Sequence, residues 1–426
     1  MTSSATVVPV PTAELRAASA AVYTAFIGAG FAAASWASRI PQVRDRLDLD
    51  PSQLGLVLLA LAGGSVLSMP LSGPVVARMG TRSTVRAMAL LLGLALGVVA
   101  VGYLTGITVL VVGLLILGFA VGAWNVAMNV QGAVVEQRLG RSIMPRYHAG
   151  YSLGTVLGAL VGVAMIAVRV PVTAHLVLAS AAVATVVIVQ VRHFVADDET
   201  TQGAIEDAGP PPARPAAAAG IDALGVGDPP AARSSLAAWR EPRTLLIGVV
   251  ALAFAFAEGT GNDWISIALI DDYGLPAALG ALAFAVFLAA MTVVRWFGPT
   301  LLDRYGRVPV VRALALVGVV GLLLFVFSPD PLLAYAGALL WGAGIALGFP
   351  VSMSAGADEP RAAAGRVSVI ATLGYCAFLG GPPLIGFLGD SYTVLRALTA
   401  VAVLLGLAVL LAEVVRAPKA GQPTSR

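Results

Sequence analysis

The sequence predicts an all-α membrane protein of twelve transmembrane helices, arranged as two pseudo-symmetric halves of six. Of its 426 residues, 58% are hydrophobic and only 12% are charged, whereas a soluble globular domain has about 25% charged residues. The segment 78–82 (RMGTR) also returns 226 positions later as 304–307 (RYGR). A repeat of half the chain length, set between long apolar runs, indicates a duplicated helical bundle with a site between its halves, a common plan of secondary transporters.

The first half contains six apolar runs, each bounded by Pro, Gly or charged residues. A membrane-spanning helix needs ~20 predominantly apolar residues, so each run predicts one span. We expect these spans at about 17–38, 53–76, 85–104, 107–135, 145–168 and 171–193.

The second half repeats this pattern. Its spans are expected at about 243–270, 276–301, 308–327, 331–355, 364–388 and 393–415. The domains are therefore two six-helix bundles at 17–193 and 241–416, with tails at 1–16 and 417–426.

Between the bundles, residues 194–240 are rich in Ala, Pro, Gly and acidic residues. That composition cannot build a core, and it predicts a disordered linker.

The basic residues predict the orientation. With twelve spans, 20 of the 26 Lys and Arg residues fall on the side of the N-terminus, five fall on the other side, and Arg295 lies within a span. Positive charge favours the cytoplasmic side, so both termini and the linker are expected on the cytoplasmic side of a plasma membrane.

Several function classes find no support. The single Cys376 excludes an internal disulfide, and the three His residues lie on separate segments, so no metal centre is expected. There is no phosphate-binding Gly-x-x-x-x-Gly-Lys-Ser/Thr motif and no nucleophile–base arrangement. We therefore expect no enzyme, no cofactor and no nucleic-acid partner, but a monomer that contacts lipid and a small solute.

Polar residues inside the spans are the candidate site, because they are expensive in lipid. Asn125 and Asn129 recur at helical spacing in span 4, with Glu136 near its end. The amides either bind substrate or join helices by hydrogen bonds. In span 5, His148 and Tyr151 share a face and either line the cavity or pack at a span end.

Span 7 carries Glu258 near mid-membrane, with Asn262 one turn on and Asp263 beside it. A carboxyl buried in apolar surroundings can exchange a proton near neutral pH, so Glu258 is the first candidate for proton coupling. A permanent salt bridge with Arg295 of span 8 is the alternative. Gly259 and Gly261 are expected to allow local unwinding of the span.

Trp36 and Trp264 lie 228 positions apart, near the same ends of spans 1 and 7. They are either interfacial belt residues or an aromatic platform for a ring-shaped substrate.

These features together resemble the major facilitator superfamily. Its signature between helices 2 and 3 is Gly-x-x-x-Asp-Arg-x-Gly-Arg, a cytoplasmic conformational latch. The first copy matches it at Gly73, Arg78, Gly80 and Arg82, with Ala77 in place of the acid and Thr81 in place of the first Arg. The second copy matches at Asp303, Arg304, Gly306 and Arg307.

Within the superfamily, four runs are similar to the fucose-permease-like branch: 36–41, 124–129, 148–154 and 257–264. Proton-coupled fucose carriers have an acid on helix 1 and another on helix 4. The matching positions here are Ala37 and Asn125, so the resemblance implies that proton coupling moves to Glu258.

The sequence thus predicts a secondary transporter that moves a small polar or amphipathic solute by alternating access, as a proton symporter. A proton-driven drug or metabolite exporter is one alternative. A transport-inactive sensor or scaffold that recruits partners through the linker is another.

Overall fold

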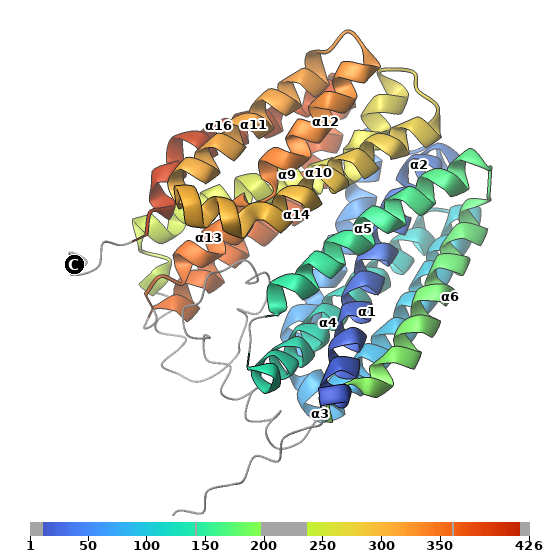
Figure 1. Ribbon diagram of the computed structural model, residues 1–426. Helices are drawn as coiled ribbons and strands as arrows, with labels where there is room; N and C mark the ends of the chain where they lie inside the picture. The colour runs from blue at the N-terminus through green and yellow to red at the C-terminus, as the bar shows by residue number, and fades with distance from the viewer. Residues whose placement is uncertain (1–11, 141–142, 197–236, 360–361, 418–426) are drawn as a thin grey trace, which may run out of the picture.

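The computed structural model describes residues 12–140, 143–196, 237–359 and 362–417. Most of the expected linker and most of both tails lie outside these ranges. The regular secondary structure within them is helical throughout. Figure 1 shows the blue and green helices of the first half beside the yellow-to-red helices of the second.

The first half runs from α1 to the short helix η1. Helices α1 and α2 together form the first span, Ala13–Leu47. The elements of this half are α1 (Thr12–Ala37), α2 (Ile40–Leu47), α3 (Pro51–Thr105), α4 (Ile107–Leu139), α5 (Met144–Ala167), α6 (Val172–Gln190) and η1 (Val191–His193).

The second half runs from α9 to the short helix η2. Helices α12 and α13 together form one span, as do α15, α16 and η2. The elements of this half are α9 (Pro242–Asp271), α10 (Ala277–Tyr305), α11 (Arg307–Phe327), α12 (Pro331–Ile345), α13 (Gly348–Gly356), α14 (Ala363–Ser391), α15 (Val394–Ala397), α16 (Thr399–Leu411) and η2 (Ala412–Val415).

Eleven helices in the described ranges are long and apolar enough to cross a membrane. The longest, α3, has 55 residues, or about 83 Å of helix, against a hydrocarbon core of ~30 Å. Its backbone leaves the helical conformation at Gly80 (φ 78°, ψ 163°). Helix α4 packs Gly118 against Leu61, before Gly80, and Gly113 against Val99, after it. The parts of α3 before and after Gly80 therefore lie side by side. Helix α3 therefore crosses twice, and the predicted twelve spans are confirmed.

The two turns of the repeat define one side of the bundle. Six spans separate the turn at Gly80 from the turn at Gly306, so both turns lie on the same side, as does the start of α1. We call this the glycine-turn side. The other side, where α9 ends at Asp271, is the Asp271 side.

Close helix contacts depend on glycine at a few positions. A Cβ at Gly154 of α5 would lie 3.0 Å from the Cα of Ile27, and one at Gly158 would lie 3.1 Å from the Cα of Phe31. These contacts let α1 and α5 touch through their backbones. Small residues four positions apart allow such close helix contact in membrane proteins.

The expected unwinding of span 7 is wrong in this structure, because α9 is a continuous helix from Pro242 to Asp271. Gly259 and Gly261 instead make room for aromatic rings. A Cβ at Gly259 would lie 3.1 Å from the ring of Phe378, and one at Gly261 would lie 2.9 Å from an atom of the Phe287 ring.

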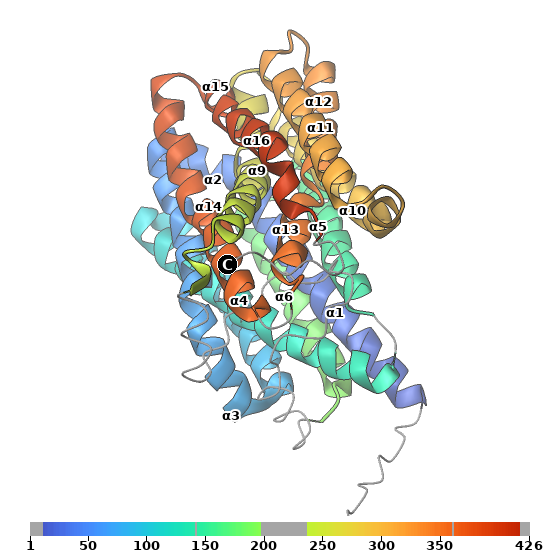
Figure 2. The same cartoon turned by 90° about the vertical axis from the view of Figure 1, so that its left-hand side faces the viewer.

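Prolines have different effects in spans 10 and 11. Span 10 is interrupted at Ala346 and Leu347, just before Pro350. Span 11, in contrast, is one helix, α14, that includes Pro382 and Pro383. It packs along α3 of the first half (Figure 2).

Candidate functional site

The centre of the candidate site is an ion pair within the second half. Arg295 of α10 donates from Nη2 to Oε2 of Glu258 in α9 over 2.7 Å. The side chains are 26% and 20% exposed, respectively. Glu258 lies near the middle of the 30-residue α9, so the pair is at membrane depth.

The break in span 10 supplies a further partner for Arg295. In a continuous helix the carbonyl of Ala346 would accept from the N–H four residues on, but that residue is Pro350, which has no N–H. The carbonyl oxygen of Ala346 instead accepts from Nε of Arg295 over 3.1 Å. The interruption of span 10 before Pro350 therefore helps to position the arginine.

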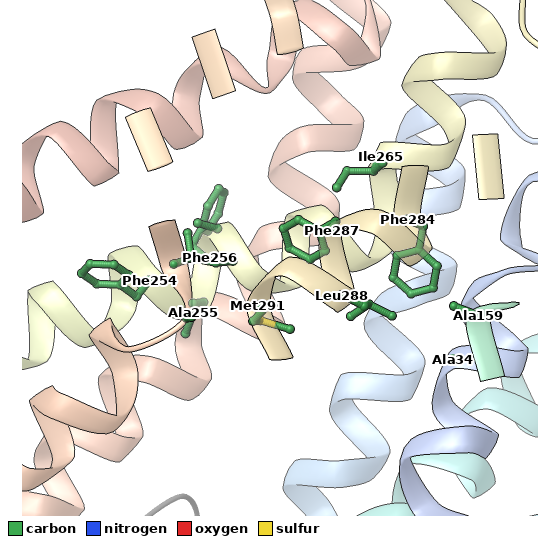
Figure 3. Close-up of a cluster of buried hydrophobic side chains, with 14 of the residues drawn as sticks. Ala34, Ala159, Phe254, Ala255, Phe256, Ile265, Phe284, Phe287, Leu288 and Met291 are labelled. Carbon is green, nitrogen blue, oxygen red and sulfur yellow. The ribbon is translucent and has the colours of Figure 1, made fainter. Parts of the chain in front are cut away.

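The two halves meet beside this pair through apolar side chains. Helix α10 packs against α5, and Figure 3 shows Phe284 and Leu288 of α10 close to Ala159 of α5 and Ala34 of α1. All four are nearly fully buried. This seam between the halves excludes water on the Asp271 side of the ion pair.

One polar residue of the first half, Tyr151, lies at the same depth as the ion pair. Tyr151 precedes Ala159 by eight residues, and Arg295 follows Leu288 by seven, so both lie about 11 Å from the seam toward the glycine-turn side. Tyr151 is within electrostatic reach of Glu258 and Arg295. The phenol group of Tyr151 has no hydrogen bond to any described residue, which leaves it available to a solute.

His148 lies on the same face of α5. Its ring packs edge-on against Phe26, with 5.0 Å between the ring centroids, and it is within electrostatic reach of Arg295. Its Nε2 is buried without a hydrogen-bond partner in the described part of the chain. The structure thus brings His148 and Tyr151 of one half near Glu258 and Arg295 of the other.

The two asparagines of α4 bind each other. Asn129, which is 1% exposed, donates from Nδ2 to the backbone oxygen and to Oδ1 of Asn125, over 2.9 and 2.8 Å. Asn125 is partly exposed. The amide N–H₂ of Asn125 makes no hydrogen bond within the described ranges, so Asn129 orients an amide that can still donate.

The remaining candidates of α9 are placed differently. Glu258, Asn262 and Asp263 are partly exposed on a helix whose other residues from Ala253 to Leu269 are buried. Glu258 and Asn262 share a face because they are four residues apart. Asp263 points elsewhere around the helix, and no described residue forms an ion pair with it.

Trp36 and Trp264 do not lie at the protein surface. They are 3% and 0% exposed, whereas belt residues contact the lipid interface. Each indole N–H is buried without a partner among the described residues. The belt interpretation is therefore wrong, and a role next to the solute stays a prediction.

The first copy of the signature makes hydrogen bonds to uncharged acceptors. Thr81, where the signature has Arg, is fully buried and donates to Oε1 of Gln131 over 2.8 Å. Arg82 donates to the backbone oxygen of Phe194 over 2.7 Å. Arg78 is exposed. These contacts join the Gly80 turn to α4 and to the end of the first half.

The second copy is held by charge. Arg307 donates to Asp358 over 2.5 Å and to Ser354 over 2.7 Å, and Arg243 reaches the same carboxylate over 3.2 Å. Asp303 and Arg304 are both exposed. In the described chain, the acid of the signature is thus unpaired, and Asp358 provides the carboxylate.

Arg366 also joins two acidic residues on the glycine-turn side of the second half. Arg366 binds Glu241 over 2.6 Å and Glu359 over 2.8 Å. Glu241 precedes α9, outside the membrane-spanning segment. Partial burial acts to raise the pKa of Glu241, but hydrogen bonds from Arg366 and Thr244 outweigh it and lower the pKa below its ordinary value.

Sequence reasoning missed the contact between Arg44 and Asp271, which joins the halves on the Asp271 side. It also missed the buried hydrogen bond from Arg39 to His175. One signal for the first was available: Asp45, which also binds Arg44, precedes Asp271 by 226 residues, the spacing of the repeat.

Comparisons with known proteins support the same architecture. The chain is 28% identical over 396 residues to the uncharacterized transporter y4wD of Sinorhizobium fredii, covering 93% of this chain and 97% of that protein. Two solved structures share the fold. A variant of the nucleoside transporter NupG has a TM-score of 0.72 at 15% identity and covers 94% of this chain and 98% of NupG.

The second is a variant of the fucose:proton symporter FucP of E. coli. It has a TM-score of 0.59 at 15% identity and covers 93% of this chain and 98% of FucP. The family model described as Major Facilitator Superfamily matches residues 15–381. This match spans ten of the twelve helices and both copies of the signature, so the chain belongs to the Major Facilitator Superfamily of membrane transporters, as predicted, and is not an enzyme.

Proposed function

We propose that this protein is a proton-coupled secondary transporter that carries a small polar or amphipathic solute across the plasma membrane by alternating access. The observation that carries the proposal is the Glu258–Arg295 pair at membrane depth, with Tyr151 of the other half at the same level and His148 within electrostatic reach of Arg295. Ionisable groups at this depth usually mark a substrate or proton pathway.

The solute is bound between the halves. Asn125 and Asn129, His148, Tyr151, Asn262, Trp36 and Trp264 provide hydrogen-bonding and aromatic groups, and Glu258 and Arg295 largely cancel each other's charge. An uncharged, hydroxyl-rich solute suits such a lining, because it needs no counter-ion. Nucleosides and sugars come first in a screen, since NupG and FucP are described as carriers of a nucleoside and of fucose.

Proton coupling is assigned to Glu258, with Arg295 as its switching partner; Asp263 is the alternative carboxylate for this role. When Arg295 turns to the solute or to another acceptor, Glu258 loses its counter-ion and binds a proton. One proton entering along a membrane potential of 100 mV provides ~2.3 kcal/mol, enough to drive about fiftyfold accumulation.

The glycine-turn side is the cytoplasmic side in this proposal, because most Lys and Arg residues belong to it. The Gly80 and Gly306 turns, with Arg78, Arg82, Asp303, Arg304 and Arg307, act there as the conformational latch. Asp303 is exposed in this state, so it is free to bind a cation of the first half when the cytoplasmic ends approach.

The test is transport by purified protein in proteoliposomes. Solutes are first selected by thermal-shift screening of sugars, nucleosides, amino acids and common drugs. Accumulation driven by an inward-directed proton gradient supports symport. A solute that leaves the compartment receiving protons would support the exporter instead, and binding without any transport would support the sensor.

A further inference from the structure

The Asp271 side is closed by one arginine that two aspartates share. Arg44 of α2 binds Asp271 of the second half through both terminal nitrogens, Nη2 to Oδ1 over 2.8 Å and Nη1 to Oδ2. Its Nε and Nη2 also donate to Oδ1 of Asp45, over 2.9 and 2.6 Å. Such bidentate, charge-assisted contacts are among the stronger polar contacts in proteins.

The arginine is fixed to the first half by a buried hydrogen bond at the start of α2. Arg39 precedes this helix and is 2% exposed. It donates from Nε to Nδ1 of His175 in α6 over 2.9 Å, and from Nη2 to the oxygen of Val170 over 3.2 Å. Helix α2 therefore moves with α6, and Arg39 is a positioning residue for Arg44.

The aspartate is fixed to the second half in a comparable way. Asp272, next to Asp271, accepts a hydrogen bond from the backbone N–H of Leu395 over 3.3 Å. Tyr273 donates to the backbone oxygens of Phe325 and Ser328 over 2.7 and 3.1 Å. Because both partners are fixed within their own halves, separating the halves breaks the Arg44–Asp271 contact and does not bend the elements that carry it.

A second contact closes the same side between α3 and α14. A Cβ at Gly55 would lie 3.0 Å from the Cα of Pro383, and one at Gly386 would lie 3.0 Å from the Cα of Ser52. Asp390 also accepts from the backbone N–H of Ser52 over 3.3 Å. The halves thus touch through their backbones here, and this side is shut in the structure.

We propose that Arg44, Asp45 and Asp271 form an outer gate in which one arginine changes its number of partners. In the closed gate Arg44 binds both carboxylates. In the open gate it keeps Asp45 of its own half and releases Asp271. Asp45 thereby prevents the cation from being left without a partner when the gate opens. That this gate faces outward rests on the orientation in the proposed function, whereas the Arg44–Asp271 contact does not.

The proposal gives the two carboxylates opposite effects. Asp271→Asn weakens only the closed state, so it should favour opening. Asp45→Asn removes the partner that Arg44 keeps in the open state, so it should favour closure. A purely structural role for the cluster would give the two substitutions similar effects.

The measurement is a distance distribution by double electron–electron resonance, in nanodiscs and without solute. Cys376 is the only cysteine of the chain, so Cys376→Ser gives a cysteine-free parent. Arg46→Cys and Ser391→Cys, both exposed on the Asp271 side, carry the spin labels. In this parent, Asp271→Asn should shift the ratio of short to long distances toward long ones by about three- to tenfold. Asp45→Asn should shift it toward short ones.

Arg44→Lys provides a second variant that keeps the charge but loses the bidentate geometry, and it should resemble Asp271→Asn. Identical distributions in the parent and in Asp271→Asn, or shifts of the same sign for both aspartates, would overturn the gate. No solute enters this measurement. Suppose that the protein transports nothing, but that Asp271→Asn and Asp45→Asn shift the distances in opposite directions as expected. This result would refute the proposed function and leave the gate standing.

Discussion

Gly80 and Gly306 lie 226 residues apart and have the same backbone conformation, with φ 78° and ψ 163° at the first and φ 79° and ψ 166° at the second. This region of backbone conformation is essentially restricted to glycine. Each glycine turns the chain between the second and third spans of its half. The duplication seen in the sequence is therefore also present in the geometry of the turns.

Replacement of either turn glycine should destabilise the protein. Gly80→Ala and Gly306→Ala place a Cβ where the backbone conformation does not tolerate one, at a cost of ~1–3 kcal/mol each. The expected result is a lower unfolding temperature in detergent. Gly73→Ala is the matched control, because Gly73 lies in a helix and a Cβ added there would meet open space. This substitution should be neutral or slightly stabilising. Equal effects at positions 73 and 80 would contradict the strain argument.

The apolar runs and the repeat were sufficient to predict the fold, because membrane depth imposes a length on each helix and a duplicated sequence imposes its pattern twice. The Glu258–Arg295 pair was foreseen as an alternative for a related reason. A carboxylate and an arginine on neighbouring spans, both at membrane depth, are much less costly together than apart.

Other features depend on tertiary contacts that the sequence does not reveal. Whether Gly259 and Gly261 unwind a helix or admit rings depends on Phe378 and Phe287, which come from other helices. The charge cluster around Asp358 likewise joins Arg243 and Arg307, which lie 115 and 51 residues away. Periodicity describes one helix at a time, so it could not assemble these groups.

The ion pair at Glu241 should make stability depend on pH. Its pKa is lowered by the hydrogen bonds from Arg366 and Thr244, so the folded state binds this proton less readily than the unfolded state. The stabilisation is present above the ordinary glutamate pKa and is lost as the pH falls through the lower pKa of the folded state. Glu241→Gln should lower the unfolding temperature at neutral pH and reduce its fall in acid. Glu14→Gln, at an exposed site, is the control, and parallel curves for Glu241→Gln and the parent would refute the prediction.

Asn125 should contribute to solute affinity through the amide that Asn129 orients. Asn125→Ala removes one neutral hydrogen bond, worth ~0.5–1.5 kcal/mol, so the dissociation constant should rise by about two- to tenfold. Binding can be measured by solute-dependent thermal shift once a solute has been found. Asn129→Ala should have a smaller effect on affinity and a larger effect on stability, because Asn129 is buried. An unchanged affinity in Asn125→Ala would return both residues to a role in helix packing.

Glu258 should be required for proton-driven accumulation but not for solute exchange. In the parent, Arg295 donates a hydrogen bond to Glu258 over 2.7 Å. Glu258→Gln keeps an oxygen that can accept this hydrogen bond, but its side chain cannot bind and release a proton. In proteoliposomes we therefore expect uphill uptake in a proton gradient to be abolished. Exchange of labelled for unlabelled solute should stay within about a factor of three of the parent, because the Gln amide resembles the protonated glutamate and still accepts a hydrogen bond from Arg295.

Asp263→Asn separates this role from that of the second carboxylate in α9. Asp263 is also partly exposed and also loses its charge in the variant, but it does not contact Arg295, so uphill uptake should persist. Arg295→Gln should impair both uptake and exchange, because it leaves Glu258 without its counter-ion in a poorly hydrated site. Full proton-driven uptake by Glu258→Gln, together with its loss in Asp263→Asn, would move the coupling site to Asp263.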